Sequence, residues 1–250
     1  MKPRSSYTIW FSQRTGSTLL CQALESTGIA GRPREWFNCP PDLLTTFKKE
    51  DQAELQEYLF KLGTTDNGVF AINHSFYEPH FTQLIETLRK FPACPPEAVK
   101  RTDVWEQVFP NHRHIFMIRR NKVRLAVSWW RAIQSGEWHI PTGEQRKSVD
   151  LSNSYSFDAI NHLYMDCSMR ETGIQEFFAE SGIAPLNIFY EDFVQNYDVT
   201  IRTILDYLEL DSTSATIAPP ALTKLADNVS EEWAQRFREE RQNGWTNRGW

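Results

Sequence analysis

Residues 12–18, with the sequence Ser-Gln-Arg-Thr-Gly-Ser-Thr, are of the types that bind a phosphate or a sulfate. They follow a run typical of a β-strand and precede a run typical of a helix, so backbone N–H groups and a helix N-terminus converge there. Gly16 permits a close approach of the backbone, Ser17 and Thr18 add hydroxyl groups, and Arg14 adds a positive charge. The pattern GxxxxGK[ST] is absent. From the turn alone, an ordinary capped helix start explains these residues equally well.

A second candidate is formed by an arginine and a serine eight residues apart. Arg120 closes a β-rich run, and Ser128 lies on the helix predicted to follow. Ligands of open α/β sheets bind beyond the carboxyl ends of the strands, so these two side chains could close on one phosphate. The alternative is a surface arginine and a serine that faces its own helix.

Glu35 and His74 are the two candidates for accepting a proton from a substrate hydroxyl. Aromatic and apolar neighbours at 33, 36 and 37 would raise the pKa of Glu35, and the arginines at 32 and 34 would oppose that shift. The alternative for Glu35 is an exposed glutamate paired with a neighbouring arginine. His74 follows the second predicted strand, and the alternative for it is a structural role.

The elements that must position these residues alternate between strands and helices, which predicts an α/β fold with a central, mainly parallel sheet flanked by helices in three layers. The whole chain, 1–250, is predicted to be one domain. Predicted strands are 7–12, 68–73, 114–119 and 187–190. Predicted helices are 17–27, 50–62, 81–90, 122–134, 157–181 and 199–208, with a last helix from Ser230. A mobile loop is expected at about 138–156 and a disordered tail at 243–250.

The composition limits the classes of function. A net charge of −5 argues against a nucleic-acid-binding protein that works through bulk electrostatics. No run approaches the roughly 20 apolar residues that a spanning helix needs, and no signal peptide is visible. Four scattered cysteines without a CxxC pair indicate reduced thiols, a cytoplasmic location and no metal site; they are Cys21, Cys39, Cys94 and Cys167.

The sequence resembles the sulfotransferases that use 3'-phosphoadenosine-5'-phosphosulfate (PAPS), and within them the mycobacterial trehalose 2-sulfotransferase group. Four segments carry the resemblance: 12–20, 27–37, 126–132 and 227–233. The fold that it implies is like that of the P-loop nucleoside triphosphatases. Two positions differ: Arg32 stands where the trehalose enzyme has an acidic residue, and Asn73 where the group tends to have a lysine.

The resemblance implies a transfer from PAPS to a hydroxyl of a carbohydrate or glycolipid, with adenosine 3',5'-bisphosphate as product, no metal and a homodimeric enzyme. Glu35 would be the base, Arg14 would stabilise the transferring group, and Tyr190 would lie against the adenine. The donor's 5' end would be bound by Gln13, Arg14, Thr15, Gly16, Ser17 and Thr18, and its 3'-phosphate by Arg120 and Ser128. The acceptor would be bound by Gln13, Arg32, Pro33, Arg34, Glu35, Trp36, Phe37 and Asn38.

Two other functions stay open at this point. The change at Asn73 favours a silent protein that binds PAPS or adenosine 3',5'-bisphosphate without turnover. A kinase of the P-loop type is disfavoured, because the lysine of its phosphate loop is missing.

Overall fold

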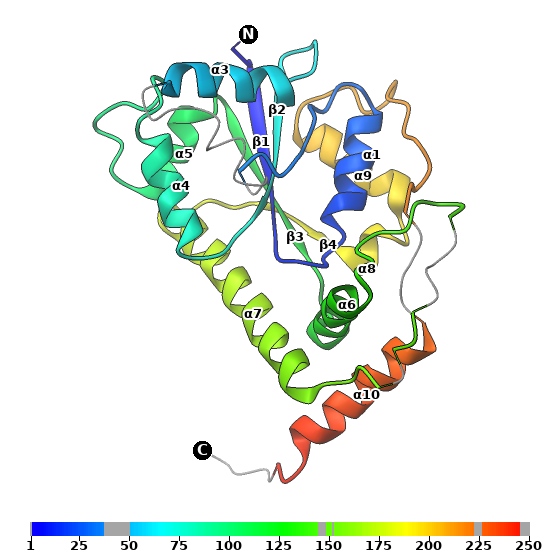
Figure 1. Ribbon diagram of the computed structural model, residues 1–250. Helices are drawn as coiled ribbons and strands as arrows, with labels where there is room; N and C mark the ends of the chain where they lie inside the picture. Colours follow the sequence, from blue (N-terminus) through cyan, green and yellow to red (C-terminus); the bar gives the residue numbers. More distant parts are fainter. Residues whose placement is uncertain (1, 38–50, 145–148, 152, 223–226, 246–250) are drawn as a thin grey trace.

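The computed structural model describes residues 2–37, 51–144, 149–151, 153–222 and 227–245. Its centre is a sheet with the strand order β2-β1-β3-β4, and every pair of neighbouring strands is parallel. The bounds are β1 Ser5–Phe11, β2 Val69–Ser75, β3 His112–Ile118 and β4 Leu186–Phe189. All four carboxyl ends therefore meet at one edge of the sheet, which faces downward in Figure 1.

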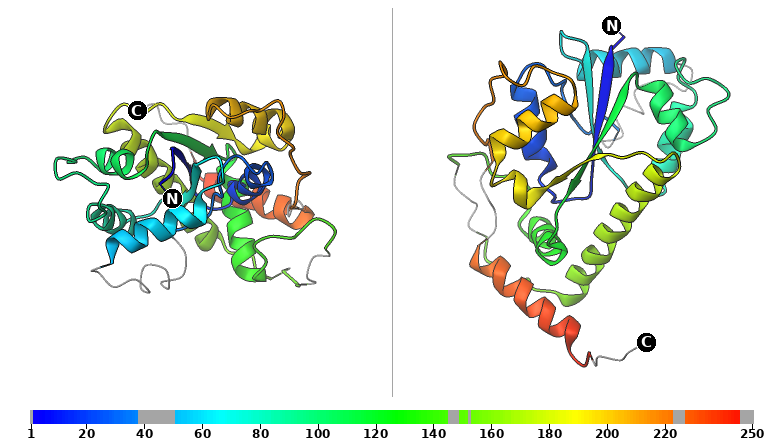
Figure 2. Two further views of the ribbon diagram at one scale, coloured as in Figure 1. Left: turned by 90° about the horizontal axis from the view of Figure 1, so that it is seen from above. Right: turned by 180° about the vertical axis from the view of Figure 1, so that it is seen from behind.

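Helices cover both faces of this sheet, which confirms the predicted three-layer α/β fold (Figures 1 and 2). One face carries α1 Ser17–Ser26 and α9 Tyr197–Tyr207, and the other carries α3 Gln52–Gly63, α4 His80–Leu88, α5 Arg101–Val108 and α7 Phe157–Ala179. The remaining helices, near the carboxyl edge, are α6 Lys122–Ser135, α8 Tyr190–Phe193 and α10 Asn228–Gln242.

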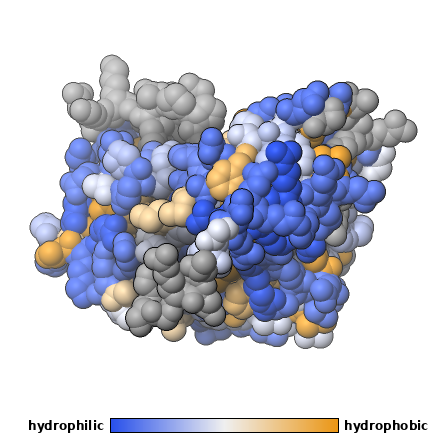
Figure 3. All heavy atoms as spheres, turned by 90° about the horizontal axis from the view of Figure 1, so that it is seen from below, coloured by the Kyte–Doolittle hydropathy of each residue, from blue (hydrophilic) through white to orange (hydrophobic). Residues whose placement is uncertain are grey.

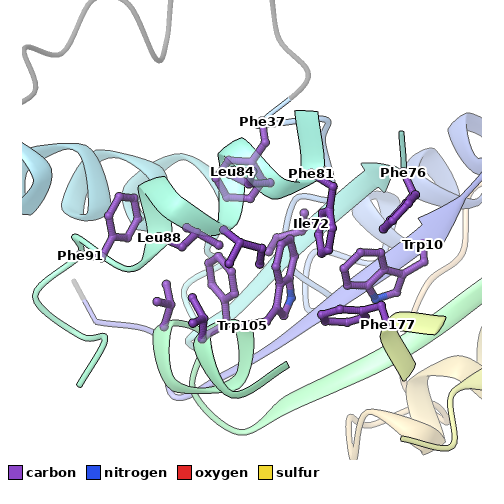
Figure 4. Close-up of a cluster of buried hydrophobic side chains, with 14 of the residues drawn as sticks. Trp10, Phe37, Ile72, Phe76, Phe81, Leu84, Leu88, Phe91, Trp105 and Phe177 are labelled. Carbon is purple, nitrogen blue, oxygen red and sulfur yellow. The ribbon is translucent and has the colours of Figure 1, made fainter. Parts of the chain in front are cut away.

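Helices can cover both faces of the sheet because the strands carry apolar side chains on both faces. In β1, Tyr7, Ile9 and Phe11 enter the core beneath α1 and α9, whereas Trp10 enters the core beneath α4, α5 and α7. Figure 4 shows Trp10 among Trp105, Phe81 and Phe177, with ring centroids 4.8–5.7 Å apart. This aromatic packing fixes β1 against three helices and so fixes where its carboxyl end points.

A third apolar cluster joins α6, α7 and α10 below the sheet edge. Trp129 of α6 lies in it with 7% of its surface exposed, and Trp233 and Phe237 of α10 are almost fully buried. The sequence predicts that at least one of the two adjacent tryptophans at 129 and 130 is buried, and the structure confirms this. The cluster fixes α6 and α10 beneath the carboxyl ends of the strands.

The bounds of the strands and helices differ from the predicted ones mainly at their ends. Helix α5 and the single turn α8 were not predicted, because both are short and α5 has only three apolar residues in eight. Helix α10 begins at Asn228 and not at Ser230: Asp227 is the N-cap, and Ser230 completes a capping box with it. Strand β2 continues to Ser75, so His74 lies inside the strand and not after it.

Of the loop predicted at 138–156, the described part has buried side chains at Ile140 and Leu151 and a bridge between Pro141 and Leu222. Residues 145–148, 152 and 246–250 lie outside the described residues, so the predicted mobility of the loop and tail stays a prediction. The three described cysteines, at 21, 94 and 167, are free thiols.

Of the two interpretations of His74, a candidate base and a structural residue, the structure supports the structural one. Its side chain is fully enclosed by the rings of Trp10, Phe37, Phe81 and Trp105, and neither ring nitrogen has a hydrogen-bond partner. Burial lowers its pKa to about 3, so the ring is neutral and away from solvent. His74 is a core residue.

This burial predicts acid sensitivity of the fold. Since the folded pKa of His74 is below the unfolded value of about 6.5, the unfolded chain takes up a proton first as the pH falls below 6.5. The free energy of unfolding should then drop by roughly 2 kcal/mol between pH 7.5 and 5 from this group alone. Urea denaturation of wild type and of His74→Phe at both pH values measures it.

His162→Phe is the matched control, because that ring is exposed on α7. We expect the control to keep the wild-type pH dependence and His74→Phe to lose part of it. Equal pH dependence in all three proteins would contradict the argument.

Candidate functional site

The turn after β1 has the conformation that the anion-binding hypothesis requires. Arg14 and Gly16 both have positive φ angles, of 63° and 90°, and Gly16 is the N-cap of α1. Any side chain at position 16 would force the turn or Tyr190 to move, because its Cβ would lie 2.6 Å from the Tyr190 ring. The Thr15 hydroxyl donates to the Ser12 carbonyl at 2.9 Å, which closes the turn on itself. The N-terminus of α1 therefore opens toward the space below the sheet edge.

A cavity of about 1090 Å³ lies there, larger than most small-molecule sites. It is bounded by the turn after β1, by most of the length of α6, by residues 137–140, by the start of α8 and the residues after that turn, and by the start of α10. Among the residues predicted to bind ligands, its wall contains Gln13, Arg14, Gly16, Ser17, Thr18, Glu35, Arg120, Ser128 and Tyr190. The two predicted anion-binding segments thus face one cavity, and the Nε of Arg14 donates to the Ser128 hydroxyl at 3.2 Å.

Arg14 is a mostly buried cation held by oxygens of uncharged groups. Besides Ser128, its guanidinium donates to the backbone carbonyl of Trp138 at 2.6 Å. Burial lowers the pKa of Arg14 to about 10, and the charge of Arg119 adds to that effect. The group remains protonated at neutral pH, and its charge faces the cavity.

Arg119 is a wall residue that the sequence reasoning missed. It lies over the Tyr190 ring at 4.9 Å and donates to the carbonyl of Arg14 at 3.2 Å. Burial lowers its pKa, as for Arg14. In the sequence, its position next to Arg120 at the end of a predicted strand was the feature that could have identified it as a site residue. In the described ranges, neither Arg14 nor Arg119 has an acidic side chain within ion-pair distance.

Arg120 differs from its neighbour because it is exposed. Its guanidinium makes two hydrogen bonds of 2.6 Å to Asp192 and lies 4.0 Å from the Phe189 ring centroid. The hydrogen bonds to Asp192 raise the pKa of Arg120. Arg120 is thus at the outer rim of the cavity, whereas Arg119 is inside.

Further wall residues come from elements far apart in the sequence. Arg124 pairs with Glu231 at 2.6 Å, and the buried Arg131 binds Asp227 at 2.5 Å, which joins α6 to the start of α10. The Thr142 backbone N–H donates to the Ala221 carbonyl at 2.9 Å beside this wall. None of these pairings had a recognisable signal in the sequence.

Of the described part of the loop predicted to bind the acceptor, residues 32–37, the side chain of Glu35 lies in the cavity wall. Both neighbours of Glu35 are bound to β2. The Asn73 N–H donates to the Arg34 carbonyl at 2.9 Å, and the Trp36 indole donates to the Ala71 carbonyl at 2.8 Å. Arg34 also pairs with Glu25 at 2.6 Å. These contacts with β2 and α1 hold Glu35 in the wall.

Other predicted site residues lie elsewhere. Phe37 does not contact the cavity: it is 2% exposed and packs against His74, Trp105 and Phe109 in the core. Pro33 is buried, Arg32 is exposed, and Asn38 lies outside the described residues. The Thr15 hydroxyl bonds within its own turn. The Trp36 indole bonds to β2, and the Arg34 guanidinium pairs with Glu25 of α1.

Gln13 lies between the turn and two neighbouring elements. Its amide nitrogen donates to the Ser75 hydroxyl at 2.5 Å, and its amide oxygen accepts from Arg170 at 2.9 Å. The Arg170 guanidinium also lies about 5 Å from the ring centroids of Tyr77 and Trp129. The orientation of the Gln13 amide is therefore fixed from both ends.

Two partly buried cations, a helix N-terminus, hydroxyl groups and the carboxylate of Glu35 share one cavity, which suits a transfer reaction on an anionic group. Residues 6–240 match the family model of the Stf0 sulphotransferases. The chain belongs to this family. It is therefore a sulfotransferase, as the resemblance in its sequence implied.

Two relatives cover nearly the whole chain. A trehalose 2-sulfotransferase of Mycolicibacterium smegmatis is 28% identical in an alignment of 266 positions, gaps included, that covers 95% of this chain and 96% of the relative. The one of Mycobacterium tuberculosis is 27% identical and covers 94% of each chain.

A solved structure shows the same fold. The sulfotransferase of Alicyclobacillus acidocaldarius aligns with a TM-score of 0.52 at 13% identity, over 100% of this chain and 98% of that one. In the described parts of the Stf0 chain, no helix is long and apolar enough to cross a membrane. Figure 3 shows that the face seen from below is mainly hydrophilic, with scattered apolar residues.

The contact between Gly16 and Tyr190 yields a prediction. Gly16→Ala forces a residue with a side chain to a φ of 90° and drives its Cβ into the Tyr190 ring. We expect a loss of unfolding free energy of about 2–4 kcal/mol, from backbone strain and steric overlap together. Thermal and urea denaturation measure it.

Gly28→Ala is the matched control. Gly28 has a φ of 71°, and nothing lies within 4 Å of a Cβ placed there, so it carries only the backbone strain of about 1–2 kcal/mol. If the two variants were equally destabilised, the Tyr190 contact would contribute nothing.

Proposed function

We propose that this sulfotransferase moves a sulfuryl group from PAPS to a hydroxyl of a carbohydrate or glycolipid. The observation that carries the proposal is that Arg14 and Arg119, two partly buried cations with no acidic side chain of the described ranges within ion-pair distance, share a cavity with Glu35. Burying a charge without a partner is costly, so an anionic ligand at this place gains the full benefit of both charges. PAPS has such anionic groups at both ends of its ribose.

The donor would lie along the wall from the turn to the start of α6. Arg14, Ser17 and the N–H groups of the turn would bind its 5' end, and Ser128 with Arg120 its 3'-phosphate. Tyr190 would lie against the adenine from the start of α8. The large cavity has room for a second substrate beside the nucleotide.

The acceptor would lie on the side of Glu35 and Gln13. The carboxylate of Glu35 would take the proton of the attacking hydroxyl, while Arg14 would stabilise charge that develops on the transferring group. Sulfuryl transfer proceeds by in-line displacement through a loose transition state, so the main task of these side chains is positioning. The relatives named trehalose 2-sulfotransferases support a sugar acceptor.

A homodimer, which the resemblance implies, and the cytoplasmic location inferred from the cysteines belong to the same proposal. Light scattering coupled to size-exclusion chromatography tests the dimer.

Glu35→Gln tests the base. We expect nucleotide affinity to be retained and kcat to fall by roughly 10²–10⁴, because only proton transfer is lost. The assay follows labelled sulfate from PAPS to trehalose and to a panel of sugars and glycolipids. Glu137→Gln removes another carboxylate of the wall and should keep most of the turnover.

An unchanged kcat in Glu35→Gln would remove Glu35 from the mechanism. A wild-type protein that binds the nucleotide but turns over no acceptor would support the silent binding protein instead.

The two adjacent arginines are predicted to differ in their effect on ligand affinity. Arg120→Ala should weaken binding of adenosine 3',5'-bisphosphate about tenfold or more and leave that of adenosine 5'-monophosphate nearly unchanged, because only the first ligand has a 3'-phosphate. Arg119→Ala should weaken both, because Arg119 contacts the turn at Arg14. Isothermal titration calorimetry measures all four affinities.

Asp192→Asn provides the control, because it removes the negative charge and one of the two acceptors that hold Arg120, while Arg120 itself is kept. It should not weaken binding of adenosine 3',5'-bisphosphate. Equal losses for both nucleotides in Arg120→Ala would mean that the 3'-phosphate binds elsewhere.

A further inference from the structure

Helix α7 carries a buried carboxylate that the proposed chemistry does not use. The side chain of Glu171 is 9% exposed and lies in the middle of the 23-residue helix. It accepts a hydrogen bond of 3.0 Å from the hydroxyl of Ser12, the fully buried residue at which β1 passes into the turn. It is not in the cavity wall, so it does not contact the ligand directly.

The same carboxylate binds Lys122, the first residue of α6. The ammonium lies 2.5 and 2.6 Å from the two carboxylate oxygens and also donates to the carbonyl of Arg119 at 2.6 Å. With side-chain exposures of 22% and 9%, this pair is well shielded from water, so its two charges interact strongly.

The position of this pair in the fold is specific. β1 and β3 are neighbouring strands in register up to Phe11 and Met117, and their backbone hydrogen bonds stop there. The two segments that follow these strands then separate. The segment after β1 enters the turn that begins at Ser12, and the segment after β3 leads through Arg119 to α6. Ser12, Glu171, Lys122 and the Arg119 carbonyl form a chain of side-chain contacts across the point where the sheet no longer connects the two segments.

We infer that Glu171 and Lys122 are positioning residues that set the distance between the anion-binding turn and the start of α6. The inference rests on the proposed function, in which one doubly phosphorylated nucleotide contacts both segments. A ligand that binds two segments at once depends on their separation, whereas a ligand that binds only one does not. A misplacement of about 1 Å is enough to cost on the order of a hundredfold in a positioned site.

The test compares two nucleotides. Isothermal titration calorimetry gives the affinities of Glu171→Gln, Lys122→Met and the double variant for adenosine 3',5'-bisphosphate and for adenosine 5'-monophosphate. We expect the first ligand to bind about tenfold more weakly or worse, and the second to lose less than about threefold. Since either single change removes the ion pair, the double variant should bind adenosine 3',5'-bisphosphate no more weakly than the single variant with the lower affinity.

Arg101→Met is the matched control. It breaks another partly buried ion pair of α7, with Glu180 at the far end of the helix, where exposures are 29% and 27%. This variant reports the general effect of loosening α7, and we expect it to lower the melting temperature without changing the ratio of the two affinities.

The outcomes separate the two proposals. If the wild type binds adenosine 3',5'-bisphosphate and the Glu171 and Lys122 variants weaken both nucleotides equally, or neither, the positioning role is overturned and the proposed function stands. If the wild type does not bind adenosine 3',5'-bisphosphate, the proposed function fails and this inference fails with it.

Discussion

The site depends on keeping two guanidinium groups, those of Arg14 and Arg119, partly buried at the sheet edge, where no carboxylate of the described residues pairs with them. Removing such charges from water costs several kcal/mol each, even after local rearrangement. The structure offsets part of this cost with a serine hydroxyl, two backbone carbonyls and the face of Tyr190. The remaining electrostatic cost is reduced when an anion binds, which couples ligand affinity to the stability of the surrounding fold.

The fold can sustain this because its rigid parts lie directly behind the site. β1 is packed by aromatic side chains on one face and by aliphatic ones on the other, so its carboxyl end has little freedom. The turn that follows is fixed by the Gly16 conformation and by Tyr190 from α8. Three of the acidic side chains nearby are bound to other cations: Asp192 to Arg120, Glu231 to Arg124 and Asp227 to Arg131. This distribution leaves the positive charge of the inner wall available.

Much of this arrangement was predictable from local patterns, and the rest was not. The strand-turn-helix at 12–18 and the placement of Ser128 at the same sheet edge followed from residue types and from the rule for parallel sheets. The hydrogen bond between Arg14 and Ser128 did not, because Ser128 was predicted to act with Arg120. Arg119 was missed because sequence alone does not show which of two adjacent arginines points inward at a strand end. Phe37 was placed in the ligand site because an aromatic residue in a loop has no periodicity that would reveal its burial. The burial of His74 was hidden for a different reason. Strand β2 runs two residues further than the predicted strand, and this places the His74 ring in the core.

Helix α10 completes the wall of the cavity from a region of the chain more than two hundred residues away from the turn. It contributes Ser230 and Glu231 to the wall and the rings of Trp233 and Phe237 to the cluster beneath it. During synthesis, the sheet and the turn leave the ribosome well before this helix does. A nascent chain with a formed sheet therefore still exposes the apolar surfaces of α6 and α7, and it gains a closed binding cavity only after translation has passed residue 242.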